Sequence, residues 1–302
     1  MSIQAPKAVV MIRPGQFRSN PDTMGDNAFQ VDVSVDATKA AAEFDQAVQN
    51  LRDAGVIVDV FNDDSDETPD SVFPNNWIST HAGGRVAVYP MFPENRRKER
   101  RWDIVEHLKR AYRVQDVMDY SGLEQDGLAL EGTGAMVLDH IEHVAYVARS
   151  NRANPVILER FCTHFGYEPM AFDASDATGA TLYHTNVMMA VGVDFALICL
   201  DMIKDTARRA EVAARLAESG RDVIDLSMEQ INEFAGNALE LSGTDGRILA
   251  LSARANAALT DDQRVRIEKT ATLAPLHIPT IETAGGSVRC MIAGVHLSRR
   301  AA

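Results

Sequence analysis

Short apolar runs separated by turn residues follow one another along most of the chain. The runs at 8–12 and 56–61 are rich in β-branched side chains, and between them, at 37–54, apolar residues recur at helical spacing as far as Gly55. Buried strands and amphipathic helices have these patterns, and glycine is a common helix stop. The first part of the chain therefore predicts a strand, a helix and a second strand.

The same order of elements then recurs. Pairs of strands around a turn are expected at 78–80 with 86–89, 135–139 with 144–147, 182–191 with 195–200 and 238–241 with 248–251, helices at 94–112, 155–165, 203–219 and 260–273, and final strands at 277–281 and around Cys290. Repetition of one supersecondary unit is typical of a closed or propeller-like array, in which polar residues at the starts of the units converge on a centre. We expect an α/β fold of this kind. Residues 1–302 are expected to form a single domain, because no low-complexity linker interrupts them.

Composition and charge narrow the classes of function. The net charge of -13 disfavours nonspecific binding to nucleic acid, which needs a cationic surface. No apolar run reaches the ~20 residues of a membrane span, and the N-terminus lacks the apolar core of a signal peptide. The three cysteines, at 162, 199 and 290, are too far apart for a CxxC zinc motif and suit a reducing cytoplasm. We expect a cytoplasmic protein without a metal, a membrane partner or a nucleic-acid partner.

Several polar residues stand at the edges of apolar runs. Glu131 follows an apolar stretch and precedes a glycine turn, His184 precedes a very apolar run, and Arg152 follows another such run. A carboxylate and an imidazole so placed suit acid–base chemistry, and a guanidinium binds carboxylates in a bidentate manner. The structural alternatives are a solvated glutamate, a satisfied core histidine and an exposed helix start. Asn76, in an asparagine pair after Pro74, is as compatible with a turn as with a site.

The segment from Thr283 to Ile292 has an unusual composition. It contains Gly285-Gly286, which tolerate positive φ and close approach, and Arg289 directly before Cys290. A neighbouring cation favours the thiolate, which is the nucleophilic form of cysteine. The alternative is a buried structural cysteine. Cys290, His184 and Glu131 would together supply a nucleophile, a proton carrier and a carboxylate if the fold gathers them.

Five segments in order resemble the guanidine-modifying enzymes of the pentein superfamily, which comprise arginine deiminases, dimethylarginine hydrolases and amidinotransferases. The matching segments are Ser71-Val72-Phe73-Pro74-Asn75-Asn76, Leu130-Glu131-Gly132-Thr133-Gly134, Ala148-Arg149-Ser150-Asn151-Arg152-Ala153-Asn154, His184-Thr185-Asn186 and Gly285-Gly286-Ser287-Val288-Arg289-Cys290-Met291. The forms Phe-Pro-Asn-Asn-Trp and Leu-Glu-Gly-Thr-Gly are most similar to the citrulline-utilisation hydrolases related to arginine deiminase. The resemblance implies a five-bladed α/β-propeller of repeated ββαβ units.

The resemblance also implies roles for individual residues. Cys290 would attack the central carbon of a guanidino or ureido group, and His184 would protonate the leaving nitrogen and then activate water. Glu131 would bind the substrate nitrogens, and Arg152 would bind the α-carboxylate. Phe73 and Arg289 complete the expected substrate contacts, and no cofactor is implied.

Two positions depart from the pattern of the arginine-processing members. Asn76 and Asn186 stand where those enzymes carry aspartates that pair with a cationic guanidinium. A buried cation without an anionic partner is costly, whereas an amide offers the donor and the acceptor that suit a neutral ureido group. We therefore expect hydrolysis of citrulline to ornithine, carbon dioxide and ammonia.

Three alternatives stay open at this point. One is a guanidine hydrolase like arginine deiminase or dimethylarginine hydrolase, and another is an amidinotransferase. The third is a catalytically silent pentein scaffold used for binding. The expected partner is a small guanidino or ureido amino acid, and a homo-oligomer is compatible with these observations.

Overall fold

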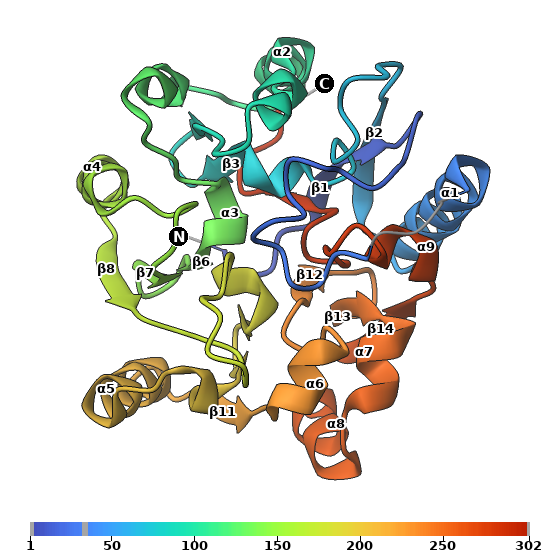
Figure 1. Ribbon diagram of the computed structural model, residues 1–302. Coiled ribbons are helices and arrows are strands. Elements are labelled where there is room, and N and C mark those ends of the chain that lie inside the picture. The colour runs from blue at the N-terminus through green and yellow to red at the C-terminus, as the bar shows by residue number, and fades with distance from the viewer. Residues whose placement is uncertain (1–2, 32–35, 301–302) are drawn as a thin grey trace.

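The computed structural model describes residues 3–31 and 36–300, and within them the strands form five separate three-stranded sheets. The expected mixed α/β class is confirmed, and the repeated unit is present. Figure 1 shows the sheets around a common middle, with helices α1, α2, α4, α5 and α8 outermost. The strands are β1 (Ala8–Arg13), β2 (Ile57–Asn62), β3 (Ile78–His81), β4 (Arg85–Val88), β5 (Asp116–Asp119), β6 (Met136–Asp139), β7 (Val144–Ala148), β8 (Glu168–Phe172), β9 (Met189–Val191), β10 (Phe195–Ile198), β11 (Asp222–Asp225), β12 (Leu239–Ser242), β13 (Arg247–Ser252), β14 (Thr272–Leu276) and β15 (Ala293–Val295).

Every sheet has the same internal order. A first strand pairs antiparallel with a second, and the second pairs parallel with a third, as in β3-β4-β5, β6-β7-β8, β9-β10-β11 and β12-β13-β14. Parallel neighbours need a crossover connection, which explains why helical segments lie between the second and third strands. The fifth sheet follows this rule with strands from both ends of the chain, because β15 pairs antiparallel with β1 and β1 pairs parallel with β2.

The helices cover the sheets with their apolar faces. They are α1 (Ala37–Asp53), α2 (Trp102–Ala111), α3 (Gly132–Ala135), α4 (Pro155–Phe165), α5 (Thr206–Ala217), α6 (Met228–Asn232), α7 (Ala253–Ala258), α8 (Asp261–Glu268) and α9 (Pro279–Glu282). Their ends follow from the sequence. Thr260 is the N-cap of α8 and forms a capping box with Gln263, and Asn154 caps α4 with Pro155 in the first turn.

The expected helix at 94–112 is wrong as a single element. Residues Asn95–Glu99 form a 3₁₀ helix, η2, and α2 begins only at Trp102 after two residues of extended backbone. The Arg96 side chain accounts for the break, because it turns inward and forms a bidentate pair with Glu99 at 2.9 Å, with both residues buried.

Two strand predictions also need correction. Only Met189–Val191 of the expected strand at 182–191 is extended, because Thr185–Val187 form the 3₁₀ helix η4. There the Thr185 hydroxyl donates to Ala135 O at 2.5 Å and accepts from Ala148 N, which binds the turn to the neighbouring sheet. The expected strand at 277–281 contains the helix α9, and Cys290 lies in a turn before β15.

Candidate active site

A turn stands directly before the first strand of every sheet, and these turns carry the polar residues of the site. The turns are η1 (Pro74–Asn76) before β3, α3 before β6, η4 before β9, residues 234–237 before β12 and residues 287–291 before β15. The short helix α3 packs against both η1 and η4. Equivalent positions in the repeated units therefore meet, although they are far apart in the sequence.

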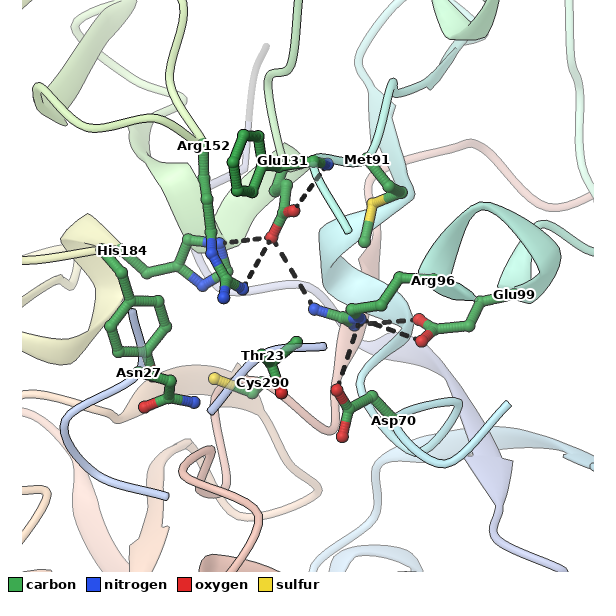
Figure 2. A network of polar contacts seen from close by, with 12 residues as sticks. Thr23, Asn27, Asp70, Met91, Arg96, Glu99, Glu131, Arg152, His184 and Cys290 are labelled. Carbon is green, nitrogen blue, oxygen red and sulfur yellow. Dashed lines mark hydrogen bonds and ion pairs between the residues drawn. The ribbon is translucent and has the colours of Figure 1, made fainter. Parts of the chain in front are cut away.

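Cys290 receives two amide contacts on its sulfur. Asn186 Nδ2 lies 3.2 Å from Cys290 Sγ, and Asn237 Nδ2 lies 3.3 Å from it. Asn237 is itself fixed, since its amide also donates to Asn186 O at 3.0 Å and its Oδ1 accepts from the Arg289 backbone N–H at 3.0 Å. The thiol is buried and lines a cavity (Figure 2). Its orientation is set by these two neutral amide groups.

His184 and Glu131 form a direct hydrogen bond. His184 Nε2 lies 2.8 Å from Glu131 Oε2, and both side chains are buried. Glu131 also accepts from the Phe92 backbone N–H at 3.0 Å and from Arg152 Nη1 at 3.3 Å. Since Nε2 is engaged by the carboxylate, Nδ1 is the nitrogen of His184 that remains for proton transfer, and no described residue bonds to it.

The loop that contains Asp26 reaches across to Arg152. Asp26 pairs with Arg152 through two hydrogen bonds, and Asn151 Nδ2 donates to the same carboxylate at 3.0 Å. The guanidinium also lies over the Tyr183 ring, 5.1 Å from its centroid. Arg152, which the resemblance assigns to a substrate carboxylate, is thus engaged by a carboxylate of the protein. Thr23 and Asn27 of the same loop line the cavity described below.

Arg96 and Asp70 are further charged residues in the site. Arg96 lies 3.7 Å from Asp70 Oδ2 and 3.7 Å from Glu131 Oε2, in addition to its pair with Glu99. Figure 2 shows Arg96 and Arg152 on either side of the Glu131 carboxylate. Asp70 also accepts from Asn20 Nδ2 at 2.6 Å, which ties the N-terminal loop to the same cluster.

These groups surround a cavity with about 280 Å³ of empty space. Its lining brings together five residues predicted from the sequence, namely Cys290, His184, Arg152, Asn76 and Phe73. Glu131 and Asn186 lie immediately behind it and contact His184 and Cys290. Asn76 Nδ2 and Asn186 Oδ1 are buried and have no hydrogen-bond partner among the described residues. A polar donor and a polar acceptor beside the cavity are therefore uncommitted.

The structure corrects the expectation for Arg289. Its side chain does not line this cavity but a second one, and its Nη1 donates to Ile292 O at 2.9 Å. The reason is the local turn, in which consecutive side chains at 289 and 290 point to different sides. Arg149, the other arginine after β7, pairs with Asp173 on the exposed surface.

Glycines in the site allow close approach of side chains. At Gly134 a Cβ would lie 2.1 Å from Asn76 Nδ2 and 2.9 Å from the His184 ring. Gly285 has φ +80, and Gly286 has the Phe73 ring against it, 2.8 Å from where a Cβ would be. Glycine is thus required at 285 and 286, as predicted, because the side chains of Asn27 and Phe73, which line the cavity, pack directly against these two positions.

Burial and charge set the protonation of the site. Burial opposes ionisation of Glu131, but Arg152, His184 and Arg96 outweigh it and hold the pKa of Glu131 well below its usual range. Burial lowers the pKa of His184, while the Glu131 carboxylate raises it in part. Glu131 is therefore an anion, and His184 is a neutral base that can take and return a proton.

Sequence reasoning missed Asn237, Asp70, Arg96 and Asp26. Asn237 could have been found from the repeat, because it stands two residues before its strand as Asn76 and Gly134 do. Asp70 directly precedes the recognised segment at 71–76. Arg96 and Asp26 carry no comparable signal, because they reach the site through side chains of a charged segment and a loop.

No group of three or more His, Cys, Asp or Glu side chains in residues 3–31 and 36–300 is placed to hold a metal ion. None of the helices in these ranges is both long and apolar enough to cross a membrane.

The fold and this cavity define an enzyme of the guanidine-modifying pentein superfamily, and the members of this class that the chain resembles are hydrolases and dihydrolases of guanidino compounds. Residues 13–297 match the family described as N,N dimethylarginine dimethylhydrolase, eukaryotic, and the chain belongs to this family. No curated protein matches the chain in sequence.

Solved structures share the fold at low identity. The N-terminal domain of ArgZ, an arginine dihydrolase from the ornithine–ammonia cycle in cyanobacteria, is 16% identical with a TM-score of 0.76, over 96% of this chain and 98% of that one. Unliganded AgrE is 16% identical with a TM-score of 0.75, over 97% of this chain and 40% of that one. A dimethylarginine dimethylaminohydrolase variant, solved as its adduct with S-methyl-L-thiocitrulline, is 13% identical with a TM-score of 0.64, over 96% of this chain and 99% of that one.

Proposed function

We propose that the protein hydrolyses a C–N bond of a guanidino or ureido amino acid through a covalent intermediate on Cys290. One observation carries this proposal: Cys290 and His184 line the same cavity, and Glu131 holds His184 at 2.8 Å. A thiol, a proton carrier and an orienting carboxylate are the parts of nucleophilic catalysis by cysteine. The family match supports a substrate of the arginine and methylarginine class.

In the proposed reaction Cys290 gives its thiol proton to His184, and Sγ bonds to the central carbon of the substrate group. One C–N bond of that carbon breaks, and His184 gives its proton to the leaving nitrogen. Water then attacks the same carbon, His184 accepts a proton from it, and the C–S bond breaks to return the thiol. Arg152 and Arg96 would hold the α-carboxylate, and Asp70 would take the α-ammonium group.

Citrulline is our preferred substrate. The uncommitted groups beside the cavity are amides, a donor at Asn76 Nδ2 and an acceptor at Asn186 Oδ1. These suit the C=O and NH2 of a neutral ureido group. With water, citrulline would give ornithine and ammonia, together with carbon dioxide from the carbamate.

Arginine or a methylarginine is the second candidate. The observation in its favour is the Glu131 carboxylate, which is held ionised next to His184 and offers one anion to a cationic guanidinium. We further propose that residues 1–302 form one catalytic domain, that the five sheets close into a five-bladed propeller, and that the protein works in the reducing cytoplasm.

Purified protein incubated with citrulline, arginine, agmatine and methylarginines tests these proposals, with ornithine, citrulline and ammonia measured. Ornithine from citrulline supports the first candidate. Citrulline formed from arginine or methylarginine, with no turnover of citrulline, supports the second. Asn76→Asp should shift the ratio of kcat/KM toward arginine by about tenfold, because a charged hydrogen bond is worth roughly 1.5–3 kcal/mol. Binding of these ligands without turnover by the wild type would refute both.

A further inference from the structure

A second cavity lies at the middle of the five sheets, separate from the active site. About 560 Å³ of space lies between its atoms, and part of this space is open to solvent. Residues of β3, β6, β9, β12 and β15 line it, so each sheet contributes its first strand. Arg289, His140 and His296 project polar groups into it, and no aspartate or glutamate is among its lining residues.

The charge of Arg289 lacks an anionic partner. Within the described residues no carboxylate lies within ion-pair distance of its guanidinium, and its hydrogen bond goes to a backbone carbonyl, Ile292 O, at 2.9 Å. Arg289 is half-buried, and it differs from the fully buried arginines at 96, 152 and 221, each of which pairs with carboxylates. Burial of a cation without a counter-charge is costly. Accordingly, burial lowers the pKa of Arg289 to about 10.

The two histidines add hydrogen-bonding capacity next to this cation. Their rings stack with centroids 3.8 Å apart. His140 is only 8% exposed, and its Nδ1 is 2.9 Å from the Tyr167 hydroxyl. When that hydroxyl donates, His140 Nε2 carries the proton and is a donor for the cavity. His296 Nδ1 donates to Ile3 O at 2.9 Å, so Nε2 of the neutral ring carries no proton and is an acceptor, which can take the O–H of a hydrogen phosphate.

The remaining polar side chains at the cavity are already engaged. Gln4 Nε2 donates to Leu138 O and Val191 O, and Gln4 Oε1 accepts from His140 N. Thr80 Oγ1 donates to Gly294 O and accepts from His296 N. The uncommitted groups are therefore the positive charge of Arg289 and the histidine nitrogens.

From this geometry we propose that the central cavity binds a small inorganic anion between Arg289 and the His140–His296 pair. The site is one residue from the nucleophile. The Arg289 backbone N–H holds Asn237 Oδ1 at 3.0 Å, and Asn237 Nδ2 contacts Cys290 Sγ at 3.3 Å. An anion on Arg289 therefore cancels the cationic field at the sulfur, and the reactivity of Cys290 falls.

The test uses inorganic phosphate as the ligand and thermal denaturation as the readout. A ligand that binds the native state raises Tm, and we expect a rise of about 2 °C at phosphate concentrations well above Kd. Arg289→Gln should lose this rise. Ala190→Leu should lose it as well, because Ala190 lines the cavity and a larger side chain fills it without touching the arginine. Arg149→Gln, at an exposed arginine, is the matched control and should keep it.

Other outcomes would overturn the proposal. Phosphate at the active-site arginines, or a general salt effect, would stabilise all four proteins equally. If Arg289→Gln does not fold, Ala190→Leu decides between the two results. Crystals soaked in bromide locate the site directly, with an anomalous peak expected next to Arg289 and His140, and the absence of a peak there together with equal Tm shifts would end the proposal.

The coupling to Cys290 has its own measurement. The rate of Cys290 alkylation by iodoacetamide should fall by about twofold or more when phosphate is added, because the bound anion neutralises the positive charge of the neighbouring Arg289. In Arg289→Gln the rate should not depend on phosphate. A phosphate-dependent rate in both proteins would assign the effect to the active site instead.

Discussion

Asp26 is bound to the guanidinium of Arg152 by two hydrogen bonds, although the two residues lie 126 positions apart in the sequence. The carboxylate comes from the loop over the cavity, and the arginine from the turn after β7. A substrate carboxylate that binds Arg152 has to displace Asp26. We therefore predict that the loop moves if a substrate carboxylate binds Arg152.

Replacing Asp26 by Asn should lower KM for a substrate with an α-carboxylate by roughly three- to tenfold, because a competing charged hydrogen bond is removed. Steady-state kinetics measures the change. Asp22→Asn, an exposed aspartate in the same loop, is the control. A higher KM in Asp26→Asn would mean that Asp26 positions Arg152 instead of competing with the substrate.

Replacing Glu131 by Gln should lower kcat by about 10²–10⁴-fold, the usual range for acid–base catalysis. The carboxylate raises the pKa of His184 against the effect of burial, so its loss lowers this pKa further. The limb of the pH profile that reports His184 should move to lower pH. Glu240→Gln is a matched control, since Glu240 is also buried and also accepts a backbone N–H, from Val193 at 2.7 Å. An unshifted limb would contradict the role of Glu131.

Replacing Gly134 by Ala should lower kcat/KM by about 10²-fold, because small displacements of catalytic groups have effects of this size. The new methyl group would lie 2.1 Å from Asn76 Nδ2 and 2.9 Å from the His184 ring, so both must shift. Gly122→Ala is the control, since its methyl group would meet nothing within 4 Å. Activity assays and thermal denaturation together separate loss of function from loss of fold, and equal activity of the two variants would refute the prediction.

Iodoacetamide at neutral pH should alkylate Cys290 before the other two cysteines. Burial raises the pKa of Cys162 to about 12 and that of Cys199 to about 11, so these thiols stay protonated and unreactive. Cys290 lines a cavity and is reached by small reagents. Mass spectrometry of tryptic peptides gives the order of labelling, and substrate should protect Cys290. Faster labelling of Cys162 or Cys199 would contradict this.

Stability should fall as the pH is lowered from 7 to 5. Burial lowers the pKa of His81, His140, His184 and His296 in the folded protein, while the unfolded chain has pKa values near the ordinary ~6.5. Below that value the unfolded state binds more protons, and each group costs up to about 1.4 kcal/mol per pH unit.

His81 offers a test of this pH dependence. Its Nε2 bonds to Ser79 Oγ at 2.7 Å, and its ring packs on Phe165 with centroids 4.3 Å apart. His81→Phe should give a shallower fall of unfolding free energy with decreasing pH than the wild type. Urea titrations at several pH values measure it, and an unchanged slope would be inconsistent with a buried neutral His81.

Much of the fold follows from local patterns in the sequence. The helix at 155–165 has its cap and its first-turn proline in the sequence, and the helix predicted at 260–273 has its N-cap at Thr260. The end of that prediction is wrong, because α8 stops at Glu268 and the strand β14 begins at Thr272. The pairing of β15 with β1 has no local signal, since it joins the two ends of the chain. The sequence predicts strands or loops where the 3₁₀ turns before β3 and β9 lie. Hydrogen bonds to neighbouring sheets, such as that from Thr185 to Ala135, decide the conformation of these turns, and such bonds have no local signal in the sequence.

The features of the site also divide into those that the sequence predicts and those that it does not. Residues in short motifs, such as Cys290, His184, Glu131 and Asn76, could be proposed from the sequence, and the structure places them around one cavity or directly behind it. Side-chain direction could not be proposed. Arg289 and Cys290 are neighbours in sequence but line different cavities, and Arg96 enters the site from a 3₁₀ helix that the sequence pattern does not separate from α2.

The pairing of β15 with β1 has a consequence for synthesis of the protein. The strand at 8–13 is synthesised long before residue 295, so it lacks its antiparallel neighbour until that residue has also emerged from the ribosome. The turn that carries Cys290 directly precedes this neighbour. A nascent chain therefore cannot complete the cavity around Cys290 until residue 295 has been made.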